Sequence, residues 1–260
     1  MITVGYSTRE HNPQFIEYLK KSSGFKKIEV IEKINNGEKS LSEVYNEILE
    51  ESTTDIVILC HDDIYFDTSS WFHKIRTHFE KSDFGILGVA GTTNMSETGR
   101  WWETNRRKDM IGIVNHESGG KKWTSKYSDD LGKSIRQTVI VDGLFIAVSK
   151  SRIKHNFDEE FKGFHFYDIA FCFKNHLEGV KVGDKVKMGD VVLRSGDKEA
   201  VKNAAVGRGF KYGDFTLAKE MGVYDEAKLS ILNERNIDPD IYQLYDPSNP
   251  YDVSLVDQIQ

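Results

Sequence analysis

Two adjacent carboxylates follow an apolar segment in the first quarter of the chain. Residues 56–60 (IVILC) are continuously apolar, which is typical of a strand buried on both faces, and His61, Asp62 and Asp63 come directly after them. Mg²⁺ and Mn²⁺ take one or two carboxylates in proteins and complete their coordination with phosphate oxygens and water. The pattern predicts a divalent-cation site that faces a diphosphate. The alternative is that Asp62 and Asp63 only begin a solvated turn.

Strand-like and helix-like segments alternate around these acids. The hydrophobic patterns indicate strands at residues 2–7, 26–36, 55–60 and 84–91, and helices at residues 13–24, 40–52 and 69–82. Alternation at this pace predicts βαβ units, and hence an α/β fold with a Rossmann-like, mostly parallel sheet flanked by helices. Ligands bind outside the carboxyl ends of the strands in such sheets. His61–Asp63, Ser7–Arg9 and Glu32–Asn36 all lie at such ends.

The second half of the chain is less regular. Residues 92–133 are rich in Gly, Trp and charge, and we expect long loops or an irregular hairpin there. A strand pair broken at Asp142-Gly143, a helix from Tyr167 to Leu177 and two short strands follow. The patterns divide the chain into an α/β domain at residues 1–196 and a helical C-terminal extension at residues 197–260 that packs on it.

Composition narrows the class of function. The formal net charge is −6 and gives no basic surface for nucleic acid. Cys60 and Cys172 form no CxxC pair, so we expect reduced thiols and a cytoplasmic location. No apolar segment approaches the roughly 20 residues that span a bilayer. We expect a soluble protein, and peripheral membrane association stays open.

Three segments together resemble a known family. Residues 32–67, 141–150 and 157–183, in this order, look like a family 2-type glycosyltransferase with a GT-A fold. The likeness is closest to a bacterial subgroup in which the metal-binding Asp-x-Asp motif takes the form His-Asp-Asp, and it covers residues 2–196. It implies transfer of a sugar from a nucleotide-diphosphate donor, with UDP-sugar favoured, to a hydroxyl of a glycan, glycoprotein or lipid-linked acceptor. It also implies inversion of the anomeric centre and dependence on Mn²⁺ or Mg²⁺.

The resemblance assigns roles to individual residues. Asp63 and His61 would bind the metal, and Asp62 would assist the metal or bind ribose. The remaining contacts to the nucleotide-sugar would come from residues near the ends of other strands and on one helix: Ser7, Thr8, Arg9, Glu32, Asn35, Asn46, Asp142 and Gly143. The alternative for most of them is an ordinary polar residue of a loop or helix, and for Asp142-Gly143 a bulge or turn.

Asp168 is the residue with the clearest chemical demand. In GFHFYDIA, Tyr167-Asp168 stands in the place of the family's Glu-Asp, whose Asp acts as the general base. An acceptor hydroxyl must lose its proton as it attacks the anomeric carbon, which requires a carboxylate within hydrogen-bond reach. The alternative is that Asp168, near the start of a helix, is only its N-cap.

Contacts to the acceptor are predicted from aromatic and imidazole side chains. Trp101 and Trp102 could stack on a sugar face, or they could form the core of the 92–133 insertion. His165, close before the helix that carries Asp168, is a further acceptor contact or a substitute metal ligand.

Two positions depart from the family pattern. Ala170 replaces a second Asp of the subgroup, and Leu193-Arg194 stand where many members place a metal-binding His. These departures support an alternative function, a catalytically impaired nucleotide-sugar-binding or scaffold protein. A nucleotidyltransferase is a third possibility, but the loop after the first strand (YSTREHN) lacks the Gly-rich phosphate loop that such enzymes use.

Overall fold

The computed structural model describes residues 1–25, 27–66, 70–96, 101–105, 108–118, 121–127, 135–184 and 193–195. For residues 102, 117, 118, 121, 122 and 193–195 it describes only the backbone. The predicted helical extension, residues 197–260, therefore lies outside the described residues.

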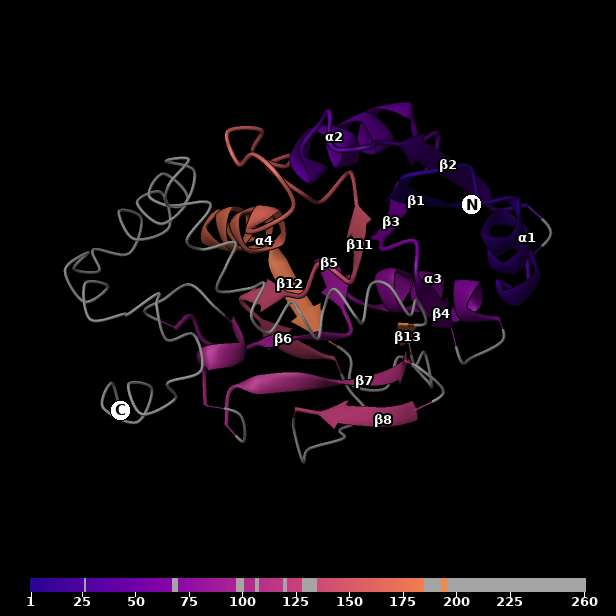
Figure 1. Ribbon diagram of the computed structural model, residues 1–260. Helices are drawn as coiled ribbons and strands as arrows, with labels where there is room; N and C mark the ends of the chain where they lie inside the picture. The colour runs from indigo at the N-terminus through magenta and orange to yellow at the C-terminus, as the bar shows by residue number, and fades with distance from the viewer. Residues whose placement is uncertain are drawn as a thin grey trace, which may run out of the picture.

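A seven-stranded sheet forms the centre of the described molecule, with the order β2-β1-β3-β11-β5-β12-β9 (Figure 1). Its members are β1 (Ile2–Thr8), β2 (Glu29–Ile34), β3 (Ile56–Cys60), β5 (Phe84–Gly88), β9 (Arg136–Thr138), β11 (Phe145–Ser149) and β12 (Lys181–Asp184). The pairs β1–β2, β1–β3 and β5–β12 are parallel. β11 runs antiparallel between β3 and β5, and β9 runs antiparallel at the edge. The prediction of an α/β fold with a mostly parallel sheet is confirmed.

Helices cover both faces of this sheet. α1 (Pro13–Ser22) and α3 (Trp71–Lys81) pack in one apolar cluster with the side chains of one sheet face. α2 (Leu41–Glu51) and α4 (Tyr167–Leu177) pack in another cluster with the opposite face. Figure 1 shows the first pair on the right and the second pair toward the top and left.

Local signals in the sequence explain where the first two helices begin. Asn12 caps α1 by accepting a bond from Phe15 N at 3.0 Å, and Pro13 occupies the first turn. At α2, Ser40 and Glu43 form the predicted capping box, in which each side chain binds the other residue's backbone N–H. These caps fix the entry of each helix after a strand of the sheet.

A second sheet lies beside the first and contains most of the described part of residues 92–133 (Figure 1). Its order is β10-β6-β7-β13-β4, with β8 added beside β7; the bounds are β4 (Ile64–Phe66), β6 (Ala90–Thr92), β7 (Met110–Ser118), β8 (Lys121–Lys126), β10 (Ile140–Val141) and β13 (Leu193–Ser195). A short 3₁₀ helix, η1 (Trp101–Glu103), follows β6. The expected hairpin is thus β7–β8, and it is regular rather than irregular.

The second sheet connects distant parts of the chain next to the paired acids. β4 begins directly after Asp63, and its Ile64 lies opposite Ser195 of β13. The segment in which the resemblance predicts a metal-binding histidine therefore runs beside the strand that follows the His-Asp-Asp segment. No helix among the described residues is long and apolar enough to cross a bilayer.

Candidate functional site

The carboxyl ends of the parallel strands lie together along one side of the seven-stranded sheet, at right angles to the outer strands β2 and β9. We call this side the site edge and the side with the amino ends of the parallel strands the opposite edge. β3 ends at Cys60, and β12 ends at Asp184 opposite Gly88 of β5. Because β11 is antiparallel, its first residue, Phe145, pairs with Cys60. The segment before β11 therefore lies next to the segment after β3, and His61 N donates to Leu144 O at 3.2 Å.

Asp142 shapes the turn that precedes β11. Its carboxylate accepts a bond from Leu144 N at 2.9 Å and another from the indole N–H of Trp101 at 3.0 Å. Its own backbone N–H donates to Ala90 O at 2.7 Å. Asp142 is thus held by its own turn, by η1 and by β6, and it fixes the position of Gly143.

Both backbone polar groups of Gly143 bond to side chains of α4. Its N–H donates to Asp168 Oδ2 at 2.8 Å, and its carbonyl accepts from the Tyr167 hydroxyl at 3.2 Å. A Cβ at this position would lie 2.1 Å from the Tyr167 hydroxyl oxygen and 3.1 Å from Asp168 Oδ2. Only glycine leaves room for this close approach, so Asp142-Gly143 is a turn built around contact with α4.

Asp168 is the second residue of α4 and is not its N-cap. The cap position is Phe166, whose φ of 64° is left-handed and whose side chain makes no capping bond. The Asp168 carboxylate points across to Gly143 and is partly buried. Burial raises the pKa of Asp168 to about 6, with a further contribution from the negative charge of Asp142. A carboxyl group with such a pKa can accept a proton near neutral pH.

The His-Asp-Asp segment lies half-buried at the same edge. The charge of Asp62 contributes to the raised pKa of Tyr45, after burial and nearer groups, and so does the charge of Asp168. Both carboxylates therefore lie near Tyr45, a fully buried residue of α2. The structure thus brings together the segments that the sequence predicted to act together.

The donor atoms at this segment suit a magnesium or manganese ion. Oδ1 of Asp63 is buried, and Asp62 supplies a second carboxylate beside it. The described residues contain no group of three or more His, Cys, Asp or Glu side chains arranged around one metal position. Hard divalent ions commonly bind one or two carboxylates and obtain their other ligands from substrate phosphates and water, so the residues present fit such an ion.

Asp184 is an acid of the site edge that sequence analysis missed. It is fully buried, and neither carboxylate oxygen has a hydrogen-bond partner among the described residues. Burial raises the pKa of Asp184 to about 8, against the opposing effect of Arg136, its neighbour on β9, and with the charge of Asp142 adding to the rise. No spacing in the sequence marks it, because only the pairing of β12 brings it to this edge.

Hydrogen bonds hold the backbone at the end of β1, where the nucleotide pocket is predicted. Thr8 is buried, its hydroxyl donates to Glu10 O at 3.1 Å, and its carbonyl accepts from Asn35 N at 2.8 Å. Ser7 is half-buried and Arg9 is exposed. The ends of β1 and β2 are therefore joined at the site edge, and their contacts with a nucleotide stay predictions.

Glu32 already has several partners within the protein. Its carboxylate accepts from the Tyr6 hydroxyl at 2.8 Å and from Asn12 N at 2.9 Å, and it pairs with His11. Burial acts to raise the pKa of Glu32, but these bonds outweigh it and the pKa is lowered. Glu32 thus holds the entry of α1 against β2, and base recognition by it stays a prediction.

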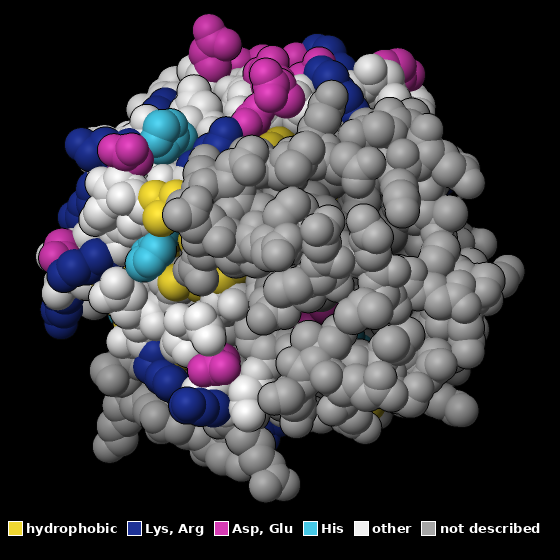
Figure 2. Space-filling model, turned by 90° about the vertical axis from the view of Figure 1, so that its left-hand side faces the viewer, with side chains coloured by type: hydrophobic (Ala, Val, Ile, Leu, Met, Phe, Trp, Pro, Cys, Tyr) yellow, Lys and Arg dark blue, Asp and Glu magenta, His cyan; other side chains and the backbone are white. Residues whose placement is uncertain are grey.

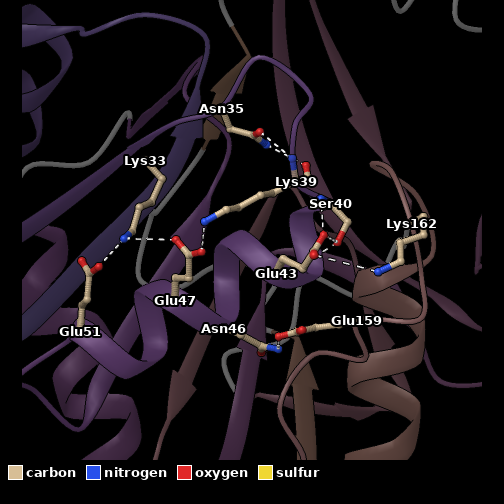
Figure 3. Close-up of polar contacts among 10 residues, drawn as sticks. All are labelled: Lys33, Asn35, Lys39, Ser40, Glu43, Asn46, Glu47, Glu51, Glu159 and Lys162. Atoms are coloured by element: carbon tan, nitrogen blue, oxygen red, sulfur yellow. Dashed lines mark hydrogen bonds and ion pairs between the residues drawn. The ribbon is translucent and has the colours of Figure 1, made fainter.

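The side-chain amides of Asn35 and Asn46 likewise form hydrogen bonds within the protein (Figure 3). Asn35 Oδ1 accepts from Gly37 N and Lys39 N, and its amide donates to Lys39 O, so it closes the turn before α2. Asn46 donates to Phe157 O at 2.8 Å and accepts from Phe157 N at 2.9 Å. These bonds anchor the loop before α4, which supports the alternative that both asparagines are structural.

Charged side chains cover the outer surface of α2. Lys33 pairs with Glu47 and Glu51, and Lys39 also pairs with Glu47 (Figure 3). Figure 2 shows acidic and basic side chains interspersed along the upper part of the described surface. Partly exposed pairs of this kind contribute little stability each, so the helix owes its place mainly to its buried face.

The predicted acceptor residues separate in the structure. Trp101 is 3% exposed and packs in the second sheet's apolar cluster, so the expectation that its ring stacks on a sugar is corrected: it belongs to the core of the insertion. The side chain of Trp102 lies outside the described residues. His165 is exposed in the loop before α4, where contact with an acceptor stays a prediction.

The chain is similar to a known protein family. A family model described as "Glycosyltransferase like family" matches residues 9–200 of the chain, which includes the site segments after Thr8. No curated protein matches the chain. Ala170, one of the two departures from the expected pattern, is buried beside Phe161, so a small apolar residue suits its position.

Three solved structures show weaker likeness. The chain matches A197 from STIV with a TM-score of 0.40 and 11% identity, over 70% of this chain and 80% of that one. It matches GalNAc-T7 with UDP, GalNAc and Mn²⁺ with a TM-score of 0.47 and 8% identity, over 75% and 44% of the two chains. It matches the mannosyltransferase PcManGT from Pyrobaculum calidifontis, in complex with GDP-Man and Mn²⁺, with a TM-score of 0.45 and 12% identity, over 74% and 56%. The TM-scores are below 0.5, and the family assignment does not depend on them.

Proposed function

The chain belongs to the glycosyltransferase-like family, and from this premise and the site geometry we propose that it is a metal-dependent, inverting glycosyltransferase of the GT-A type. The donor is a nucleotide-diphosphate sugar, with a UDP-sugar favoured, and the acceptor is a hydroxyl of a glycan, glycoprotein or lipid-linked saccharide. The free, buried thiols of Cys60 and Cys172 suit the cytoplasm, the compartment we propose for it.

The observation that carries the proposal is the position of Asp168. Its carboxylate is fixed by the Gly143 peptide at the site edge, and its pKa is raised to about 6. A base whose pKa lies close to the working pH is both deprotonated and able to take a proton. Asp168 thus meets the two requirements of a general base, a fixed position and a suitable pKa.

The reaction follows from these residues. Asp168 accepts the proton of the acceptor hydroxyl as the oxygen attacks the anomeric carbon of the donor sugar. The bond from that carbon to the diphosphate breaks on the opposite side, so a single displacement inverts the anomeric centre. Asp142 and Gly143 border the sugar beside Asp168, and Ser7, Thr8 and Arg9 line the nucleotide side. Backbone order at both borders reduces the entropy lost in aligning donor and acceptor.

Asp63 and His61 would hold Mn²⁺ or Mg²⁺, and Asp62 would support the ion or the ribose. When bound, the ion neutralises the negative charge that develops on the leaving diphosphate. The chain's own contribution is to fix this segment at the end of β3, through the bond from His61 N to Leu144 O.

A thermal-shift and turnover screen tests the proposal. We expect UDP or a nucleotide-sugar with Mn²⁺ to raise the melting temperature of the wild type, and Asp63→Ala to abolish the rise. Asp83→Asn is the matched control, because Asp83 is an exposed acid paired with Lys181 at the opposite sheet edge. Consumption of at least one nucleotide-sugar with a glycan acceptor is the second expected result.

Two outcomes would contradict the proposal. Binding of nucleotide without consumption of any donor across a sugar panel would favour the alternative of a binding or scaffold protein. Equal shifts in the wild type and Asp63→Ala would remove the metal assignment.

A further inference from the structure

Two buried tyrosines connect the segments that we assign to the metal and to the general base. Tyr45 comes from α2 and Tyr167 from α4, and they are 1% and 4% exposed. Their rings pack edge to face, with centroids 5.4 Å apart and an interplanar angle of 79°. Such packing fixes the relative position of two helices on the same face of the sheet.

Each hydroxyl donates to a carbonyl at the site edge. Tyr45 donates to Cys60 O at 3.3 Å, and Cys60 directly precedes His61. Tyr167 donates to Gly143 O at 3.2 Å, and the N–H of the same glycine binds Asp168. One tyrosine therefore contacts the metal-binding side of the site and the other the base side, and the two rings touch.

A purely apolar core would not need these hydroxyl groups. Two phenylalanines would provide the same edge-to-face contact, whereas a buried hydroxyl must recover the hydrogen bonds it loses to water. Gly143 lies in a turn, and the Tyr167 hydroxyl is the side-chain group that binds its carbonyl. The polar ends of both tyrosines thus act on the two backbone positions that flank the site.

The charges of both acids act on Tyr45. Burial raises the pKa of Tyr45 well above its ordinary value, and among the smaller contributions are the charges of Asp168 and Asp62. The hydroxyl of Tyr45 therefore interacts electrostatically with Asp62 on the metal side of the site and with Asp168 on the base side. This agrees with the bonding pattern, in which the pair spans from β3 to α4.

We propose that Tyr45 and Tyr167 are positioning residues that hold the His61–Asp63 segment and Asp168 in a fixed relation, so that donor binding and base alignment are coupled through their contact. The inference deepens the proposed function and rests on it. Neither tyrosine needs to touch the substrate. Their effect is on the geometry in which the metal-bound donor and the base face each other.

Tyr→Phe variants test this coupling, because they remove one oxygen and keep the ring. We expect Tyr167→Phe to lower kcat about tenfold with little change in the donor KM, since it loosens the Gly143–Asp168 contact. We expect Tyr45→Phe to raise the donor KM and the Mn²⁺ concentration needed for half-maximal activity by about fivefold. In the double variant the combined loss should be smaller than the product of the single losses.

Ser52→Ala is the matched control for stability. Ser52 is buried at the opposite sheet edge, where its hydroxyl bonds to Thr3 and Thr54. We expect it to lower the melting temperature about as much as the tyrosine variants and to leave kcat and KM within twofold of wild type. If the tyrosine variants behave like Ser52→Ala, or if their effects multiply independently, the inference is wrong.

A second measurement separates this inference from the proposed function. The ¹³C resonance of the Asp168 carboxyl, assigned by its loss in Asp168→Asn, should shift when UDP and Mg²⁺ bind the wild type, and Tyr45→Phe should at least halve that shift. An undiminished shift in Tyr45→Phe overturns the coupling even where turnover is normal. A wild type that binds UDP, shows the shift and consumes no donor overturns the proposed function and leaves the coupling supported.

Discussion

Two pairs of acids, one at each edge of the seven-stranded sheet, have pKa values shifted in opposite directions. At the edge away from the site, Glu29 and Asp55 have lowered pKa values, because bonds from neighbouring hydroxyl and N–H groups outweigh the effect of burial. At the site edge, Asp168 and Asp184 have raised pKa values, because burial outweighs the bonds and charges around them. Glu32, at the same end of the strands, has a lowered pKa because its own partners outweigh burial, so the raised pKa values single out Asp168 and Asp184 rather than the whole edge.

The edge away from the site is a closed polar network. Thr3 bonds to Ser52 at 2.6 Å, to Thr54 at 2.8 Å and to Glu29, and all three hydroxyl-bearing residues are buried. Lys150 donates to Leu49 O and Ser52 O, which ends α2. Each of these groups has partners within the protein, so the network stabilises the fold.

The site edge is an open arrangement by comparison. Asp168 has one bond from another element and lies beside Asp142, and Asp184 has none among the described residues. Poorly compensated acids cost stability and are characteristic of functional sites. The difference between these two pairs of acids is consistent with the role that we propose for Asp168.

The largest expected effect is the loss of turnover in Asp168→Asn. The amide keeps the shape of the side chain but cannot accept the acceptor's proton, so we expect kcat to fall about 10²- to 10⁴-fold. Nucleotide-dependent thermal stabilisation should persist, because the donor side is unchanged. Steady-state kinetics and thermal shift check both parts, and a kcat within threefold of wild type would exclude Asp168 as the base.

Gly143→Ala should damage the site edge next. Its Cβ would lie 2.1 Å from the Tyr167 hydroxyl oxygen, so the turn or α4 must move. We expect unfolding free energy to fall by about 1–3 kcal/mol and kcat to fall at least tenfold. Gly37→Ala is a control without a steric clash, because nothing lies within 4 Å of the added Cβ; any loss there reports the strain of its positive φ of 98°. Denaturant unfolding and kinetics measure both effects, and normal kcat in Gly143→Ala would show that the contact with α4 is dispensable.

Asp184→Asn should stabilise the protein increasingly as pH rises. The folded-state pKa of about 8 lies above the unfolded value near 3.9, so the wild type keeps its full stability below about pH 4 and loses part of it as pH rises through 8. The amide has no charge to desolvate. We expect a gain of about 1–3 kcal/mol at pH 9 and almost none at pH 4.5. Urea unfolding at both pH values checks this, and a gain independent of pH would contradict it.

Asp55→Asn should have the smallest effect, with the opposite pH dependence. Asp55 accepts from the Ser149 hydroxyl and from Ser151 N, both at 2.8 Å. Because its folded-state pKa is lowered, its contribution is present above the unfolded value and is lost as pH falls through the folded value. We expect a loss of about 1 kcal/mol at pH 7 and unchanged kcat. A change in kcat would mean that the two edges are not independent.

The fold class and the alternation of strands and helices in the first part of the chain could be predicted from the sequence, whereas the roles of the site residues stay predictions. Continuous apolar runs and capping residues such as Ser40 are local signals, and the strands and helices they mark are present. That Asp142 and Asp168 would act with the His-Asp-Asp segment was expected from the resemblance alone. β4 was missed because its three residues carry no periodicity of their own.

The remaining differences depend on contacts between distant segments. Whether Trp101 stacks on a ligand or packs in a core is decided by the second sheet, which forms from widely separated strands. Asn46 was predicted to bind the nucleotide-sugar, which stays a prediction; its bond to the backbone of Phe157, 111 residues away, could not be predicted from local patterns. Asp184 becomes unusual only when β12 pairs with β5 and β9. Local patterns contain none of this information.

β11 runs antiparallel between β3 and β5, so its first residue lies at the site edge and its last residue at the opposite edge. Phe145 begins it beside the turn that contacts α4, and Ser149 ends it in the opposite network, with both neighbouring strands bonded along its length. Amide protons in the middle of β11 should therefore exchange with deuterium more slowly than those of β2, which is an outer strand of the sheet. A ligand that immobilises Gly143 should slow exchange at Ser151, whose N–H binds Asp55 at the other end of β11.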